Sequence, residues 1–229
     1  MVTIPSLQEM LAAGLHFGHQ LSKKHPKMDD FIYASKQKVA IIDLEKTGEG
    51  LARAAEFVKQ VAAANGVILF VGSKRQAKIA VEEQAKRCGM PYVNTRWLGG
   101  TFTNFASIVK LIKKLKRLKD EQVKGELAKY TKKEQLDFQN EIIRLDELVG
   151  GLEVMDRLPQ AIVVIDIKKE KTVIAEAKAV KIPVIALTDS NTNPEKVEYA
   201  IPANDDATKG ITLALQVLTD AILEGQGQR

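Results

Sequence analysis

Short apolar runs rich in β-branched residues alternate with longer segments of helical periodicity through most of this 229-residue chain. The runs have the length of buried strands and the segments between them can form crossover helices, which is the pattern of repeated βαβ units. Buried parallel strands are expected at residues 39–44, 67–73, 91–94, 161–167 and 183–189, and crossover helices at 51–65, 74–88 and 169–181. A short extended piece at 199–204 and a helix at 207–223 close the pattern. The predicted fold is a three-layer α/β/α sandwich with a mainly parallel sheet, flavodoxin-like or Rossmann-like.

Residues 101–149 interrupt this pattern because they are rich in Lys, Glu and Leu and contain no strand-like run. Apolar residues in each half recur three and four apart, as in a coiled-coil seam. Thr131 and Glu134 form a capping box that begins a second helix, and Gly125 lies in the turn before it, so an antiparallel hairpin is expected. The expected seam residues are Ile108, Leu111, Leu115 and Leu118, then Phe138, Ile142, Leu145, Val149 and Leu152. The predicted domains are an α/β domain of residues 1–100 and 151–229, and an inserted hairpin of residues 101–150.

The segment RWLGGTFTN, residues 96–104, contains a glycine pair just before the first predicted arm. Such a segment can cradle a phosphate with its backbone N–H groups, or it can be a structural hinge. A second doublet, Gly150–Gly151, stands where the hairpin returns, and two sharp turns favour the hinge, with positive φ at both roots. Thr103 or Asn104 is the expected N-cap of the first arm. Trp97 is expected to pack in the root.

Seven motifs, in this order and spacing, resemble the bacterial-type small ribosomal subunit protein two family over nearly the whole chain. They are LAAGLHFGHQ at 11–20, PKM at 26–28, IIDLEKT at 41–47, LFVGSKRQA at 69–77, NTRWLGGTFTN at 94–104, LTD at 187–189 and IPANDDA at 201–207. The resemblance implies a structural constituent of the small ribosomal subunit with no catalytic role. It also implies contacts with small-subunit ribosomal RNA and neighbouring ribosomal proteins, and in many bacteria with the messenger-binding protein S-one.

Basic residues slightly outnumber acidic ones, 34 to 29, and the formal charge of +5 is a mild bias toward polyanions. The densest basic stretch, residues 110–119, contains six Lys or Arg in ten residues and few acids, which suits RNA phosphates; the alternative is a solvated helix face. Arg96 is expected to pair with a phosphate or a carboxylate. The candidate RNA-binding residues are Lys23, Lys24, Lys27, Lys74, Arg75, Arg96, Lys110, Lys113, Lys114 and Arg117.

One cysteine, Cys88, excludes an internal disulfide framework, and the chain contains no run of about 18 apolar residues. These features favour a cytoplasmic protein with no membrane partner.

The alternative function is a nucleotide- or metal-binding α/β enzyme that uses the crevice at the carboxyl ends of the strands. Asp43, Ser73, Asp166 and Asp189 are all expected at such ends, where open α/β sheets bind ligands. The chain contains none of the glycine-rich phosphate-binding motifs and no G-x-S-x-G, so no catalytic residue is predicted.

A divalent metal site in the same crevice is a hypothesis beside this, since the family resemblance requires no cofactor. Its ligands would be His19, Asp189 and Asp205, and the imidazole favours zinc over magnesium. The alternative is that Asp205 or Asp206 caps the last helix. His16 is expected to be a hydrogen-bonded core or cap residue.

Overall fold

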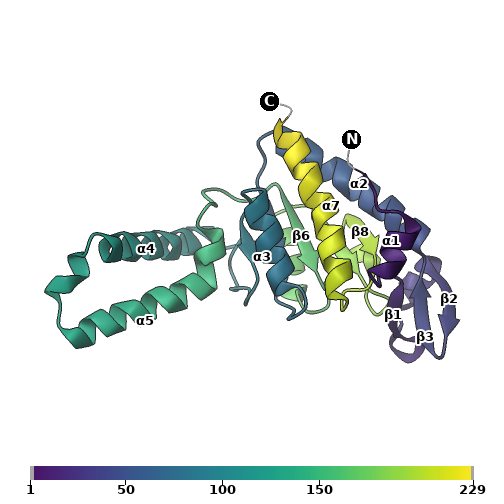
Figure 1. Ribbon diagram of the computed structural model, residues 1–229, viewed down its shortest axis with the longest axis horizontal. Coiled ribbons are helices and arrows are strands. Elements are labelled where there is room, and N and C mark those ends of the chain that lie inside the picture. Colours follow the sequence, from purple (N-terminus) through teal and green to yellow (C-terminus); the bar gives the residue numbers. More distant parts are fainter. Residues whose placement is uncertain (1–2, 228–229) are drawn as a thin grey trace.

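A parallel sheet of five strands forms the centre of the protein, for which a computed structural model describes residues 3–227 (Figure 1). The strands run in the order β5-β4-β6-β7-β8, and every neighbouring pair is parallel. This is the flavodoxin-like order, with one reversal between β4 and β6. The strands are β4 (Ile68–Val71), β5 (Tyr92–Val93), β6 (Ala161–Ile165), β7 (Val184–Thr188) and β8 (Tyr199–Pro202). The predicted parallel α/β fold is confirmed.

Two apolar layers cover the two faces of this sheet. Phe70 and alternate residues of the neighbouring strands face α2, α3 and α7, whereas Leu69 and Val71 face α6 and the base of the hairpin. The alternation follows from the period of two along a strand. The helices outside the hairpin are α1 (Leu7–Ala12), α2 (Leu44–Ala63), α3 (Lys78–Arg87), α6 (Lys171–Ala179) and α7 (Thr208–Gly227). The 3-10 helices are η1 (Leu21–Lys23), η2 (Pro26–Phe31), η3 (Glu126–Lys129), η4 (Gly150–Leu152) and η5 (Pro194–Lys196).

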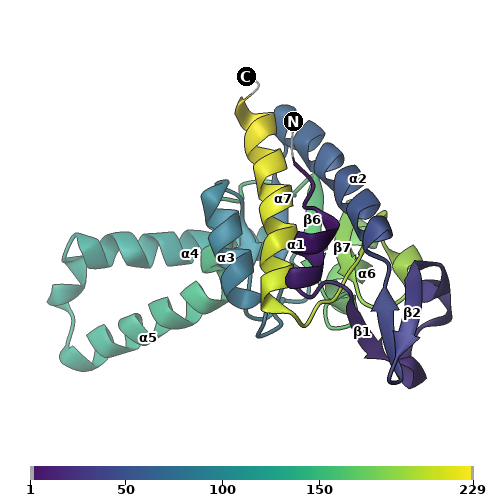
Figure 2. The same cartoon turned by 45° about the vertical axis from the view of Figure 1, so that its right-hand side comes forward.

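A second, three-stranded sheet lies beside the C-terminal end of α1 and the N-terminal end of α2 (Figure 2), and it corrects one prediction. Residues 39–44 were expected to be a buried parallel strand, but they pair antiparallel with the strand before them. Gln37 and Lys38 both have positive φ, +50° and +64°, as a two-residue hairpin turn requires. The turn folds the chain back before it can reach the main sheet. The strands are β1 (Phe17–Gln20), β2 (Ile32–Lys36) and β3 (Val39–Ile42).

The hairpin consists of α4 (Phe105–Val123) and α5 (Lys132–Val149), and it projects from one end of the molecule (Figures 1 and 2). Thr131 and Glu134 form the expected capping box, and Gly125 has the left-handed φ of +72° in the turn. The predicted seam is confirmed in seven of its nine residues, which are buried. Leu111 and Phe138 are partly buried, and Ile112 is a buried seam residue that the prediction omitted.

The seam continues into the apolar layer beneath α6 through Trp97 and Phe102. Whether hairpin and core are independent domains therefore stays a prediction. No helix in residues 3–227 is both long and apolar enough to cross a membrane.

The two glycine doublets at the roots of the hairpin differ from each other. Gly100 has the expected positive φ of +90°, but Gly150 has a helical φ of −58°, so the expectation of positive φ at both roots was wrong. Gly151 is needed for space, because a Cβ at this position would lie 2.2 Å from the carbonyl oxygen of Tyr92. The return of the hairpin therefore packs directly on β5. The first arm begins after Asn104, whose side chain makes no capping hydrogen bond.

Candidate RNA interface and charged crevice

The two arms of the hairpin carry opposite charge. α4 has six cationic and two anionic side chains, and α5 has five anionic and three cationic ones. Ion pairs between the arms use part of this charge: Lys114 Nζ lies 2.6 Å from Glu141 Oε1, and Lys119 pairs with Asp146 and, at 2.6 Å, with Glu153. The seam and these pairs hold the acidic arm against the basic one.

The outer surface of α4 keeps three cations without such partners. Lys110, Lys113 and Lys116 are exposed, and no ion pair involves them within residues 3–227. Arg117 pairs with Glu121 one turn further along the same helix, at 3.6 Å. Of the four predicted RNA-binding residues of this arm, Lys110 and Lys113 are the two that remain available.

The predicted basic residues outside the hairpin fall into two groups. Lys24 pairs with Asp29, and Lys27 lies 2.8 Å from Glu195, so both have local partners. Lys23, Arg75 and Arg96 are exposed and form no ion pair among the residues that the structure describes. Arg96 therefore has no internal carboxylate partner, contrary to one of its two predicted roles.

Lys74 was predicted to bind RNA, but its ammonium group is used inside the protein. Its side chain is 15% exposed, and Nζ lies 2.5 Å from Asp205, 2.6 Å from Asp206 and 3.6 Å from Asp166. Burial opposes its charge, but hydrogen bonds with Asp205 and Asp206 outweigh burial and raise the pKa of Lys74. The residue lies in the turn before α3, and a cation with three carboxylate neighbours cannot serve an RNA phosphate as well.

Asp205 is the most buried of these carboxylates, with a side chain 3% exposed. Burial and the charges of Asp189 and Asp166 raise the pKa of Asp205 to about 7, although Lys74 opposes the shift. The crevice therefore holds more carboxylates than its single ammonium group can neutralise.

The predicted metal ligands are corrected in one position. His19 Nδ1 lies 3.0 Å from Asp189 Oδ1, and its Nε2 lies 3.6 Å from Asp206 Oδ2. One ligand atom from each of these three residues lies within 4.8 Å of the others. Asp206, and not the predicted Asp205, completes this group, although both carboxylates also contact Lys74. One imidazole and two carboxylates are a donor set that suits a divalent ion.

Two polar side chains of the N-terminal region, Asp43 and His16, differ from expectation. Asp43 accepts a hydrogen bond from the Glu45 N–H as the N-cap of α2, outside the crevice, because β3 belongs to the small sheet. The Nδ1 atom of His16 is buried without a hydrogen-bond partner within residues 3–227, so this residue is not the hydrogen-bonded one expected. Its ring lies 3.9 Å from that of Phe17, and burial lowers its pKa.

The segment RWLGGTFTN does bind an anion, which is a carboxylate of the protein itself. Glu176 of α6 accepts hydrogen bonds from the Trp97 indole N–H at 3.0 Å and from the backbone N–H groups of Gly100 at 2.8 Å and Phe102 at 3.0 Å. The Glu176 side chain and the Trp97 ring are both buried, which confirms the packing role of Trp97. The segment therefore has both predicted roles: it binds an anion, and it forms the turn at the root of the hairpin.

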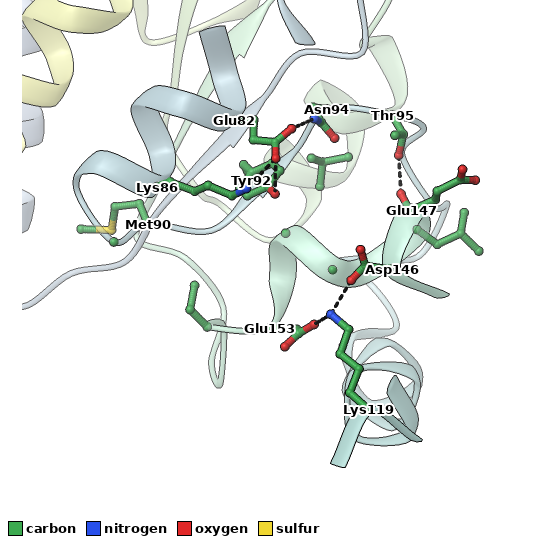
Figure 3. A pocket seen from close by; sticks show the side chains of 16 residues that line it. Glu82, Lys86, Met90, Tyr92, Asn94, Thr95, Lys119, Asp146, Glu147 and Glu153 are labelled. Carbon is green, nitrogen blue, oxygen red and sulfur yellow. Dashed lines mark hydrogen bonds and ion pairs between the residues drawn. The ribbon is translucent and has the colours of Figure 1, made fainter. Parts of the chain in front are cut away.

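A pocket of about 650 Å³ lies on the other side of the hairpin root, between α3, β5 and η4 (Figure 3). Both of its cations are paired in its own wall: Lys86 with Glu82 at 2.6 Å, and Lys119 with Asp146 and Glu153. The Thr95 hydroxyl donates to the carbonyl of Glu147 at 2.6 Å, which ties the return arm to the loop after β5. The pocket offers an anion no free charge.

Comparison with known proteins decides the family. The family model described as ribosomal protein S2 matches residues 10–225. The chain is 45% identical to the small ribosomal subunit protein uS2 of Dehalococcoides mccartyi over 221 residues, which cover 96% of this chain and 90% of the relative. It is 44% identical to the uS2 proteins of Acidothermus cellulolyticus and Thermobifida fusca, over 98% of this chain and 82% and 77% of theirs.

The chain belongs to the ribosomal protein S2 family.

The relatives are named as ribosomal proteins, which are not enzymes. Membership of the S2 family therefore rules out the enzyme alternative, and this chain is not an enzyme. The structure adds a physical reason at the reversal point of the sheet. Glu170 accepts hydrogen bonds there from the Ser73 N–H at 3.1 Å and from the Ser73 hydroxyl at 2.5 Å. In this S2-family chain a carboxylate occupies the loop that would have to accept a phosphate.

Proposed function

We propose that this S2-family chain is a structural constituent of the small ribosomal subunit in the cytoplasm, where it docks on ribosomal RNA with the outer surface of α4. The observation that carries the proposal is the set of exposed cations Lys110, Lys113 and Lys116, which form no ion pair with any residue that the structure describes. Phosphate contacts supply most of the sequence-independent affinity for RNA and fix the register of a docked protein.

The charge separation between the arms supports this orientation. Glu141 and Asp146 of α5 neutralise Lys114 and Lys119, which lie toward the second arm. The cations that remain lie away from those acids, so an approaching phosphate meets an excess of positive charge on α4 and an excess of negative charge on α5. The first arm should therefore lie closer to RNA than the second.

Co-sedimentation with small subunits across a salt series tests this proposal. The variant Lys110→Glu/Lys113→Glu should weaken association and flatten the log–log salt slope by about two units, because each phosphate contact contributes roughly 0.9 by analogy with duplex DNA. The matched control is Lys132→Glu/Lys133→Glu, which makes the same charge change on exposed residues of α5. Identical salt curves for the wild type and the α4 variant would contradict the proposed interface.

Neighbouring ribosomal proteins are the second class of proposed partner. Leu7, Leu11, Phe17 and Tyr33 expose an unusual amount of apolar surface around α1, β1 and β2, and Tyr33 is 79% exposed. We infer that a neighbouring small-subunit protein covers this patch, with S-one as the named candidate. Leu11→Ser/Tyr33→Ser should reduce capture of purified S-one, whereas Val123→Ser at the hairpin tip should not. Equal capture by both variants would remove S-one from this patch.

A bound divalent metal is proposed for the group His19, Asp189 and Asp206. The proposal is supported by the closeness of the three ligand atoms and by the nitrogen and oxygen donors, which favour zinc. Elemental analysis of protein purified without chelator should find stoichiometric metal in the wild type and none in His19→Ala, while His25→Ala should keep it. Wild-type protein without metal would contradict the site.

A further inference from the structure

One buried carboxylate, Glu176, receives most of the hydrogen bonds that the loop at the start of the hairpin directs toward α6. Glu176 Oε1 accepts from the Trp97 indole and the Gly100 N–H, and Oε2 accepts from the Phe102 N–H. The Thr103 N–H and hydroxyl lie 3.4 and 3.5 Å from Oε2. Five donors from one short loop thus converge on a side chain 8% exposed.

Such convergence is the geometry of an anion-binding nest. Successive backbone N–H groups form a concave, positively polarised surface when one residue adopts the left-handed conformation, and Gly100 supplies it with φ of +90°. Burial raises the pKa of Glu176, but the hydrogen bonds from Trp97 and the backbone outweigh it and keep the pKa below its ordinary value. The carboxylate is therefore ionised where the nest requires an anion.

We propose that Glu176 is the internal ligand of an anion-binding loop at residues 97–103, and that it is the positioning residue that fixes the direction of the hairpin on the core. Glu176 belongs to α6, which packs on the main sheet, whereas the loop leads directly into α4. Rotation of α4 about the loop must break these hydrogen bonds.

Two kinds of contact hold the loop against the core. Trp97 and Phe102 meet edge to face with ring centroids 4.9 Å apart and pack in the apolar layer beneath α6. Apolar packing is not directional, whereas hydrogen bonds depend on angle. Glu176 joins the loop to α6, and through α6 to the main sheet, by charge-assisted hydrogen bonds.

Trp97 gives a direct optical test, because it is the only tryptophan of the chain. Glu176→Ala should shift its emission to the red and increase its quenching by acrylamide, and acetate should reverse both effects by refilling the nest. The control is Glu170→Gln, which alters another buried carboxylate at the start of α6, one that accepts its hydrogen bonds from Ser73. Unchanged Trp97 emission and quenching in Glu176→Ala would overturn the assignment of the internal ligand.

Spin labels at Gln60→Cys on α2 and Val123→Cys at the hairpin tip test the positioning role. Both residues are exposed, while Cys88 is buried and its burial raises the pKa of the thiol to about 11, so it does not compete for the label. The distance distribution should broaden in Glu176→Ala and stay narrow in Glu170→Gln. A distribution as narrow as that of the wild type would overturn the proposal. If Glu176→Ala does not fold, the isosteric Glu176→Gln decides by the same two measurements.

The effect of Glu176→Gln on binding to small subunits rests on the proposed function, and the experiment below distinguishes failure of the positioning role from failure of that function. If Glu176→Gln reduces the fraction of correctly directed hairpins to about one tenth, association with small subunits should weaken about tenfold. Its salt slope should be unchanged, because no phosphate contact is removed. A broadened distance distribution without loss of association would refute the α4 interface and leave the positioning role intact.

Discussion

The crevice at the carboxyl ends of the strands and the outer surface of α4 use the same residue type in opposite ways. Lys74 in the crevice is 15% exposed and touches three carboxylates, whereas Lys113 on α4 is exposed and has no ion-pair partner among the described residues. A buried ammonium group is held by its internal partners, and an exposed one keeps its charge for an external phosphate. The number of internal acids, and not the density of lysines in the sequence, separates the two roles.

The largest effect is expected in the crevice. Lys74→Met should destabilise the protein by roughly 3–5 kcal/mol, because it leaves Asp205, Asp206 and Asp166 without a buried counter-charge. Lys113→Met should change the free energy of unfolding by no more than about 0.5 kcal/mol. Urea unfolding of both variants at pH 7 measures the difference. Equal losses would show that the contrast between the two regions has no energetic basis.

An intermediate effect, dependent on pH, is expected at Glu176. Glu176→Gln should cost about 1–3 kcal/mol at neutral pH, since hydrogen bonds to a charged acceptor are lost. The pKa of Glu176 in the folded protein is lowered from 4.5, so its contribution is complete above that value and disappears as the pH falls through the folded pKa.

The measurement is the difference in unfolding free energy between wild type and Glu176→Gln from pH 7 to pH 3. Subtracting the two proteins cancels the other carboxylates, which titrate in both. A difference that grows as the pH falls would contradict the direction of the pKa shift.

The smallest effect is expected between the arms of the hairpin. Lys114 and Glu141 are partly exposed, so a double-mutant cycle should give a coupling of about 0.2–1 kcal/mol. A parallel cycle between Lys113 and Glu141 should give none, because Lys113 has no such contact. Coupling of equal size in both cycles would mean that the arms attract each other through the long-range electrostatics of all their charges and not through the Lys114–Glu141 ion pair.

Periodicity predicted the layers and the hairpin because each rests on contacts that repeat along the chain. The main sheet and the capping box of α5 were confirmed. The seam omitted Ile112, because Leu111 and Ile112 both fit a spacing of three and four from Ile108 to Leu115 and the prediction took only Leu111. The strand at residues 39–44 was placed in the wrong sheet. Its apolar run looks like a parallel strand, and only the positive φ values of Gln37 and Lys38 reveal the turn.

The site was less predictable because it depends on single contacts between distant segments. Asp205 and Asp206 are adjacent in the sequence, and only the loop geometry decides that both contact Lys74 and that Asp206 also lies beside His19. Glu176 was missed entirely. The one sequence signal was an acid among the apolar residues of α6, and no spacing rule links it to a loop 73 to 79 residues earlier.

The segment that follows α5 also covers one edge of the main sheet. β5 is only two residues long, and Gly151 packs against it so closely that a Cβ at this position would lie 2.2 Å from the Tyr92 carbonyl oxygen. At the opposite edge β8 ends at Pro202, whose carbonyl accepts a hydrogen bond from Thr47 of α2 at 2.6 Å. Neither edge offers a long free ladder to another chain. The main sheet therefore presents little unpaired strand edge to a second copy of the chain, which limits strand-to-strand association through this sheet.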